Sequence, residues 1–159
     1  MATTQDIEEL SHIRCMLSDS FYANERFDRK AFSSIASFAL QHGYLTERQR
    51  KYVLGQWDHY TKIKKGNENL ESSLRSTFLS LLHRTCALNC YLDHSLRSYF
   101  GQIRIISRRV EEGKFIYPSD ISALERVVKQ YSTRGVNVDD ISVGIQNFKN
   151  KLPIDLLPP

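Results

Sequence analysis

The sequence is poor in helix-breaking residues, in cysteine and in long apolar runs. Its 159 residues include only four prolines and seven glycines, and this scarcity favours helices over a turn-rich β fold. No apolar run approaches the roughly 18 residues that a membrane-spanning helix needs. The start of the chain, MATTQDIEELSH, is acidic and lacks the apolar segment of a secretory signal. Three cysteines make an odd number, which predicts reduced thiols in a cytoplasmic protein.

The composition is typical of a globular helical protein. Hydrophobic residues make up 41% of the chain and charged residues 25%, a balance that allows a buried core. A chain of this length usually forms one domain. We therefore expect a single all-α domain over residues 1–152, a bundle of five to six helices, followed by a non-helical tail at 153–159.

Local signals predict where the N-terminal helices begin and end. The spacing of apolar residues predicts a first helix from Thr4 to about Phe21. Asp28 is placed to cap a second helix, with Phe27 and Phe32 at the spacing of a hydrophobic staple. That helix should end at Gly43, because glycine readily adopts the left-handed conformation that follows a helix.

The same kind of signal predicts three more helix starts. Thr46 and Gln49 form the Thr-x-x-Gln pattern of a capping box, so a third helix should begin there and end near 65–66. Pro118 should start a later helix, because proline suits the first helical turn. The last helix should start at Asp139 or Asp140 and end before the proline at 153.

The longest apolar pattern lies between Phe78 and Val110. At about 100° of rotation per residue, its apolar side chains fall within a sector about 120° wide. Such a stripe predicts one helix of more than thirty residues, about 50 Å long, around which the others pack. The stripe comprises Phe78, Leu81, Leu82, Leu88, Leu92, Leu96, Tyr99, Phe100, Ile103, Ile106 and Val110.

A row of metal-ligand residue types follows another side of this segment. His83, Cys86, Cys90 and His94 all fall within about 80° on one helix face. The eleven residues from His83 to His94 would rise about 16 Å on a straight helix, whereas ligands of one metal lie within roughly 4 Å of each other. We expect a second, smaller buried face here, with no metal or other cofactor, although adjacent pairs such as Cys86 and Cys90 leave a shared site conceivable.

Patterns associated with catalysis are missing. The sequence has no Gly-x-Ser-x-Gly elbow, no phosphate-cradling glycine loop and no His-Glu-x-x-His pair. The adjacent acidic pairs at 111–112 and 139–140 point about 100° apart on a helix, so neither forms a carboxylate dyad. The sequence therefore predicts a protein that is not an enzyme.

Positive charge is unevenly distributed along the chain. Residues 1–47 hold four basic and seven acidic residues, whereas 48–65 hold six basic and one acidic, as do 72–110. Within these segments the spacing places seven basic side chains in two rows, away from the predicted apolar faces. The first row is Arg48, Lys51, Lys62 and Lys65, and the second is Arg97, Arg104 and Arg108. Such rows suit a polyanion, although charged faces are also common on ordinary exposed helices.

The segment 32–53 also resembles a known pattern. Its sequence, FSSIASFALQHGYLTERQRKYV, places Gly43, Leu45, Thr46, Arg48 and Gln49 as in a helical hairpin found in phage replication and repair proteins. The resemblance implies a phage or mobile-element origin and a nucleic-acid partner, and it brings no catalytic residue. The turn is about one residue too long for a helix-turn-helix that reads DNA sequence.

The predicted function is therefore binding without catalysis. We expect a small phage-like accessory protein, in the host cytoplasm if phage-encoded, that holds DNA or RNA on its basic rows without sequence specificity. Tyr44 or Tyr52 could then stack on an unpaired base. One alternative is an anti-defence inhibitor or adaptor docked on an acidic protein surface, and another, by analogy alone, is a helical small subunit of an RNA-guided effector complex. An apolar patch at Ile154, Leu156 and Leu157 would suit a protein partner or a homodimer.

Overall fold

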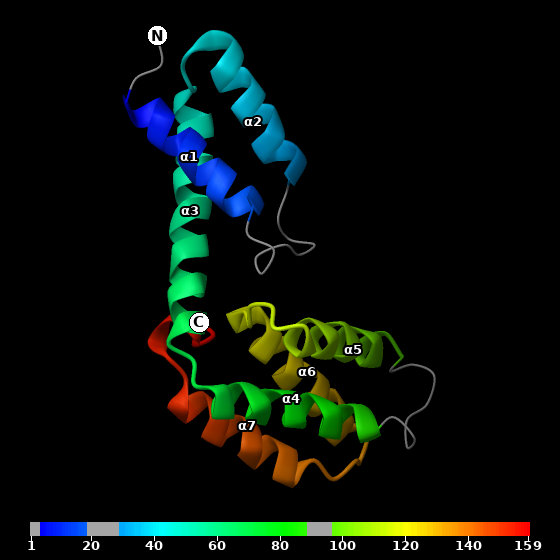
Figure 1. Cartoon of the computed structure of the whole chain (residues 1–159). Coiled ribbons are helices and arrows are strands. Elements are labelled where there is room, and N and C mark those ends of the chain that lie inside the picture. The colour runs from blue at the N-terminus through cyan, green and yellow to red at the C-terminus, as the bar shows by residue number, and fades with distance from the viewer. Residues whose placement is uncertain (1–3, 19–28, 89–96) are drawn as a thin grey trace. The chain divides into compact units, whose positions relative to one another are not determined.

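The fold is described from a computed structural model, which covers residues 4–18, 29–88 and 97–159 (Figure 1). These residues form seven α-helices and contain no strand, so the predicted all-α class is confirmed over the described part of the chain. The helices are α1 (Thr4–Ser18), α2 (Arg29–His42), α3 (Glu47–Glu68), α4 (Ser72–Ala87), α5 (Arg97–Glu111), α6 (Pro118–Thr133) and α7 (Asp139–Lys151). Their number exceeds the predicted five to six.

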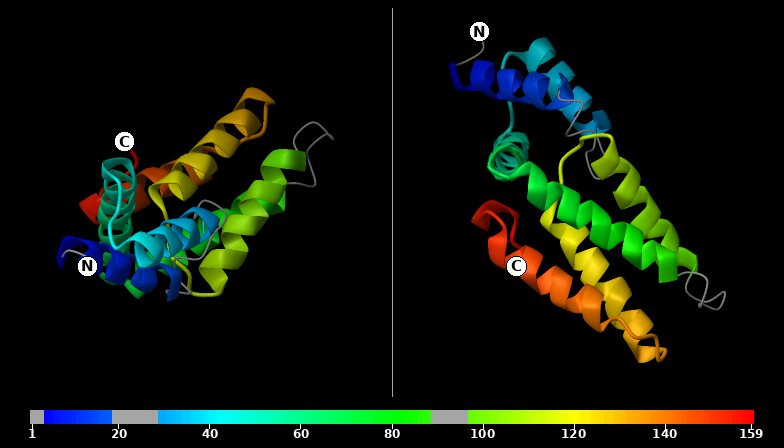
Figure 2. Two further views of the ribbon diagram at one scale, coloured as in Figure 1. Left: turned by 90° about the horizontal axis from the view of Figure 1, so that it is seen from above. Right: turned by 60° about the horizontal axis from the view of Figure 1, so that its bottom comes forward.

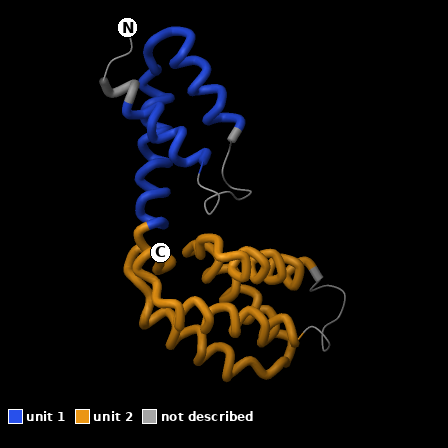
Figure 3. Tube along the Cα trace, viewed as in Figure 1, with its two compact units in different colours: residues 1–64 blue, residues 65–159 orange. Residues whose placement is uncertain are grey.

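The chain divides into two compact units (Figure 3). Unit 1 comprises residues 1–64 and unit 2 residues 65–159, so α3 crosses the boundary. None of the described helices combines the length and apolarity needed to cross a bilayer.

Unit 1 is built on α1, α2 and the first part of α3. Val53, Tyr60 and Ile63 on α3 are buried, as their spacing predicts, and Trp57 stacks on His12 of α1 with ring centroids 4.0 Å apart. Other buried side chains from α1 and α2 complete this core: Ile13, Met16, Phe32, Ile35 and Ala39.

The predicted start of α3 is confirmed atom by atom. The backbone N–H of Thr46 donates to Gln49 Oε1 at 2.9 Å, and the N–H of Gln49 donates to Thr46 Oγ1 at 3.2 Å. Before it, Gly43 has φ of 74°, the left-handed conformation expected after α2. The predicted staple and cap at Phe27 and Asp28, and the end of the first helix near Phe21, lie outside the described residues.

In unit 2, α4, α5, α6 and α7 contact one another in cyclic order (Figures 1 and 2). Phe78 of α4 stacks on Phe148 of α7, with ring centroids 5.1 Å apart, and both rings are buried. The helix starts predicted at Pro118 and Asp139 are confirmed.

The single long helix predicted across 78–110 is wrong. Helix α4 ends at Ala87, and α5 begins at Arg97 and packs against it. Arg75 near the start of α4 contacts the end of α5, so the two helices are antiparallel. The error has a simple cause. When two consecutive helices pack on the same core, the angular positions of their apolar residues can continue from one helix to the next as if they belonged to a single helix. The stripe positions Leu92 and Leu96 lie outside the described residues.

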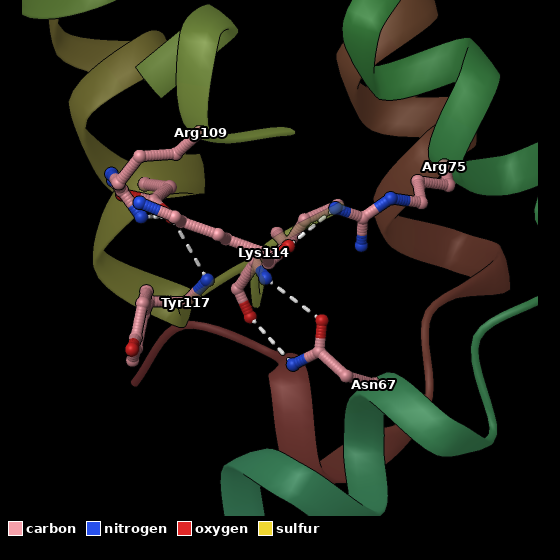
Figure 4. Close-up of polar contacts among 7 residues, drawn as sticks. Asn67, Arg75, Arg109, Lys114 and Tyr117 are labelled. Atoms are coloured by element: carbon pink, nitrogen blue, oxygen red, sulfur yellow. Dashed lines mark hydrogen bonds and ion pairs between the residues drawn. The ribbon is translucent and has the colours of Figure 1, made fainter. Parts of the chain in front are cut away.

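Polar contacts within unit 2 fix the turn that follows α5 (Figure 4). The guanidinium of Arg75 donates to the carbonyls of Val110, at 3.1 Å, and Lys114. The side chain of Asn67 bonds both backbone groups of Ile116, accepting from its N–H at 2.8 Å and donating to its carbonyl at 3.0 Å. These contacts satisfy backbone groups that the end of a helix leaves open, and they hold α5 in register with α4.

A buried ion pair joins α5 to α6 at the same place. Arg109 Nη2 lies 2.6 Å from Asp120 Oδ1, and the two side chains are 18% and 4% exposed. Asp120 also accepts the backbone N–H of Tyr117 at 2.9 Å, which caps α6. The carboxylate thus has two donors, as a buried charge requires.

The tail after residue 152 is only partly as predicted. Residues Ile154–Leu156 form a short 3-10 helix, η3, where no helix was expected. Leu156 is fully buried and lies so close to Gly66 that a Cβ there would be 2.6 Å from Leu156 Cγ. Of the apolar patch predicted at the tail, only Ile154, 81% exposed, and Leu157, 39% exposed, face solvent.

Candidate nucleic-acid interface

The first predicted basic row lies on the outer face of α3. Arg48, Lys51, Lys62 and Lys65 are all exposed, as expected. Lys51 lies 3.4 Å from Glu47, but the two side chains are 77% and 84% exposed, and such a pair contributes little to stability. Lys65 belongs to unit 2, so the part of the row within unit 1 consists of the other three residues.

The second predicted row lies on α5. Arg104 and Arg108 are exposed, and among the described residues no carboxylate forms an ion pair with either. Arg104 lies over the ring of Phe100, 5.7 Å from its centroid. The backbone of Arg97 starts α5, but its side chain lies outside the described ones.

Two of the arginines in segment 72–110, Arg75 and Arg109, make polar contacts within the protein. Arg75 serves as a hydrogen-bond donor to the turn after α5, and burial lowers the pKa of its guanidinium. Arg109 is neutralised by Asp120. Arg84, Arg104 and Arg108 of this segment are exposed, and none of them forms an ion pair with a described carboxylate; Arg104 and Arg108 are the two that share a helix, α5.

A groove between α4 and α5 runs beside these two arginines. Its volume is about 290 Å³, and its lining mixes basic, aromatic and hydroxyl side chains. The lining residues are His83, Cys86, Phe100, Arg104, Ser107, Arg108 and Glu111. The antiparallel packing of α4 on α5 creates this groove, so the prediction of one continuous helix could not have found it.

The buried Ser107 and the half-buried Cys86 both line the groove. Ser107 is 7% exposed, and its hydroxyl oxygen has no hydrogen-bond partner among the described residues. Its neighbour Cys86 offers only sulfur, a weak acceptor. Burial raises the pKa of the Cys86 thiol, and the positive charge of Arg104 and the Ser107 hydroxyl oppose that shift.

The buried face predicted from His83, Cys86, Cys90 and His94 does not include its first residue. His83 is exposed, and its Nε2 lies 2.7 Å from Glu111 Oε1 across the groove. Cys86 is half-buried, whereas Cys90 and His94 lie outside the described residues. Within the described part of the chain, no three histidine, cysteine or acidic side chains gather closely enough to hold a metal ion.

The aromatic side chains differ in their suitability for stacking. Tyr44 is 52% exposed but meets Phe38 edge-on, and Tyr52 is 36% exposed and contacts Phe32. Phe100, assigned from the sequence to the apolar stripe, instead lines the groove beneath Arg104. The spacing of Phe100 and Arg104, four residues apart on one helix, is the signal that could have identified this pair.

The start of α3 differs from a DNA-reading helix-turn-helix at a position that is buried and aliphatic in that motif. Such a motif would place a buried aliphatic side chain at Gln49 or Arg50. Gln49 closes the capping box of α3, and Arg50 forms an ion pair of 3.1 Å with the buried Glu9. Both side chains therefore serve the internal structure of unit 1.

Comparison of the chain with models of protein families, with curated proteins and with solved structures finds no match. The candidate interface is thus defined by its own geometry and charge.

Proposed function

We propose that this protein is a small accessory protein that binds DNA or RNA on basic helix faces without catalysing a reaction. The observation that carries the proposal is the pair Arg104 and Arg108, exposed beside one groove and not paired with any described carboxylate. A phosphate neutralised by such a side chain releases condensed counterions, which favours association.

The exposed row on α3 supports the same proposal. Arg48 and Lys62 are 14 residues apart and lie within about 40° of each other on the helix, so their side chains follow one line along its outer face. Rows of this kind contact a sugar–phosphate backbone and carry no sequence information by themselves. The phage-like origin implied by residues 32–53 belongs to this proposal as well.

The test is a fluorescence-anisotropy titration of a labelled single-stranded oligonucleotide and of a duplex at two salt concentrations. We expect affinity in the micromolar range or better that falls steeply with salt. Arg104→Glu/Arg108→Glu should weaken binding at least tenfold. Lys129→Glu/Lys151→Glu changes the net charge equally on exposed sites of α6 and α7, and it should have a much smaller effect. Equal effects of the two variants would overturn the assignment to α5.

An alternative is an inhibitor or adaptor that docks on an acidic protein surface. Ile105 favours it, because this side chain is 53% exposed directly beside Arg104 on α5. An apolar side chain between cations suits a protein interface better than a phosphate backbone. Under this alternative the titration shows no binding of either nucleic acid, and Ile105→Ser abolishes the capture of an acidic partner protein.

A further inference from the structure

We infer that the groove between α4 and α5 is a pocket for one phosphate group of the bound strand, an inference that rests on the proposed function. Arg104 and Arg108 supply positive charge at the groove, and Ser107 supplies a hydroxyl donor at its wall. A volume of about 290 Å³ lies near the lower end of the range of roughly 300–1,000 Å³ found for small-ligand sites, so the phosphate can enter with part of its nucleotide.

The Ser107 hydroxyl is the observation that distinguishes a pocket from a merely basic surface. A buried hydroxyl whose described surroundings offer only a thiol is poorly satisfied, which is unfavourable. Ser107 is buried on α5, at the groove, between the two arginines in sequence. A phosphate oxygen held by those arginines is the strong acceptor that this hydroxyl lacks.

The rest of the lining determines where the phosphate can lie. Glu111 would repel an anion, but it is engaged by His83 at 2.7 Å at the far end of α5 from Phe100. The phosphate therefore belongs nearer Phe100 and Arg104, where the guanidinium lies over the ring, 5.7 Å from its centroid. A base attached to that phosphate can stack against this pair, as single-stranded nucleic acids do on aromatic side chains and arginine.

Cys86 lines the same pocket and reports directly on its occupancy. The test is the rate of alkylation by iodoacetamide, a neutral reagent, with fragment-ion peptide mapping to separate Cys86 from Cys90, four residues away, and from Cys15 in unit 1. A saturating single-stranded oligonucleotide should slow alkylation of Cys86 several-fold and leave Cys15 unchanged. A bound phosphate both blocks access and disfavours the thiolate that reacts, so the two effects have the same sign.

Ser107→Ala tests the hydroxyl itself. It should weaken oligonucleotide binding about tenfold, because a hydrogen bond to a charged group is lost. The same variant should leave the free energy of unfolding unchanged or higher, because a poorly satisfied buried hydroxyl is removed. Ser122→Ala, at an exposed position of α6, is the matched control: it makes the same gain in helix propensity and should leave oligonucleotide binding unchanged.

The possible failures are distinguishable. If the oligonucleotide binds but neither the alkylation of Cys86 nor the affinity of Ser107→Ala changes, the pocket is wrong and the proposed function stands. A third arm replaces chloride with inorganic phosphate at constant ionic strength and pH. Slower alkylation of Cys86 in that arm without oligonucleotide binding would support the pocket and overturn the proposed function.

Discussion

Asp120 is the buried carboxylate on which two helices of unit 2 depend. It receives the guanidinium of Arg109 from α5 and the backbone N–H of Tyr117 at the start of α6. Arg109 also lies 5.5 Å from the centroid of the Tyr117 ring. Removing one partner from such a buried pair leaves the other charge uncompensated, which costs more than the pair itself contributes.

Asp120→Asn should therefore lower the free energy of unfolding by about 3 kcal/mol. The amide can still accept from Tyr117, but it cannot neutralise Arg109. Asp139→Asn is the control, because this exposed aspartate in the first turn of α7 contributes at most about 1 kcal/mol through the helix dipole. Urea unfolding of both variants makes the comparison, and equal losses would contradict the role given to Asp120.

The Cys86 thiol should make the protein less stable at alkaline pH. Burial raises its pKa above the ordinary value of 9.0, so the unfolded chain loses this proton at a lower pH than the folded one. The stabilisation is complete below pH 9.0 and is lost as pH rises from there toward the folded-state pKa. The loss of stability between pH 8 and pH 10 should be smaller in Cys86→Ser, measured by urea unfolding in reducing buffer.

Tyr131 provides the matched comparison at higher pH. Burial first, and the nearby Cys86 second, raise its pKa above 10.0. By the same linkage, Tyr131→Phe should reduce the loss of stability above pH 10 and leave the change from pH 8 to pH 9 as it is. A decline between pH 8 and pH 10 that is identical in the wild type and Cys86→Ser would show that the thiol does not control it.

Sequence reasoning at the scale of residues identified the exposed arginines but not their surroundings. Arg104 and Arg108 were predicted from helical spacing alone, because a face opposite the apolar stripe must be exposed. Cys86 and Ser107 are twenty-one positions apart, and only the pairing of α4 with α5 brings them to one groove. Arg75 and Arg109 could not be recognised as internal for the same reason: their acceptors are set by tertiary contacts.

At the scale of helices, starts and stops were predictable because their signals are local. The signals at Thr46, Gly43 and Pro118 depend on residues no more than four positions away. The helix boundary predicted from each of them is found in the structure. The separation of α4 from α5 was not predictable from apolar spacing. A single continuous helix can show a given spacing of apolar residues along the sequence. Two antiparallel helices that bury their apolar faces in one shared core can show the same spacing.

Glycines in helices make a second test at this scale. A Cβ at Gly101 of α5 would meet nothing within 4 Å, whereas a Cβ at Gly66 of α3 would lie 2.6 Å from Leu156 Cγ. Gly101→Ala should therefore raise the free energy of unfolding by about 1 kcal/mol, the difference in helix propensity. Gly66→Ala should lower it by about 1 kcal/mol or more, because Leu156 is fully buried and must move. Chemical denaturation of the two variants checks both signs, and a loss at Gly101 would contradict the open helix face.

At the scale of the whole molecule, charge is segregated along the chain. The net charge is +4, yet residues 1–47 are acidic in balance and the two basic segments follow them. Each compact unit carries its own exposed basic row, on α3 in unit 1 and on α5 in unit 2. Binding of a polyanion should therefore depend on specific faces more than on total charge.

Under the proposed function, the salt dependence of binding gives the number of phosphates that those faces neutralise. For a single strand, the slope of log affinity against log salt changes by about 0.7 for each phosphate contact. Arg104→Ala/Arg108→Ala should therefore reduce the magnitude of the slope by about 1.4, whereas Lys129→Ala/Lys151→Ala should leave it nearly unchanged. Anisotropy titrations at four or more salt concentrations give both slopes. If the two variants lowered the slope equally, binding would reflect the overall charge of the protein, and the α5 face would have no special role.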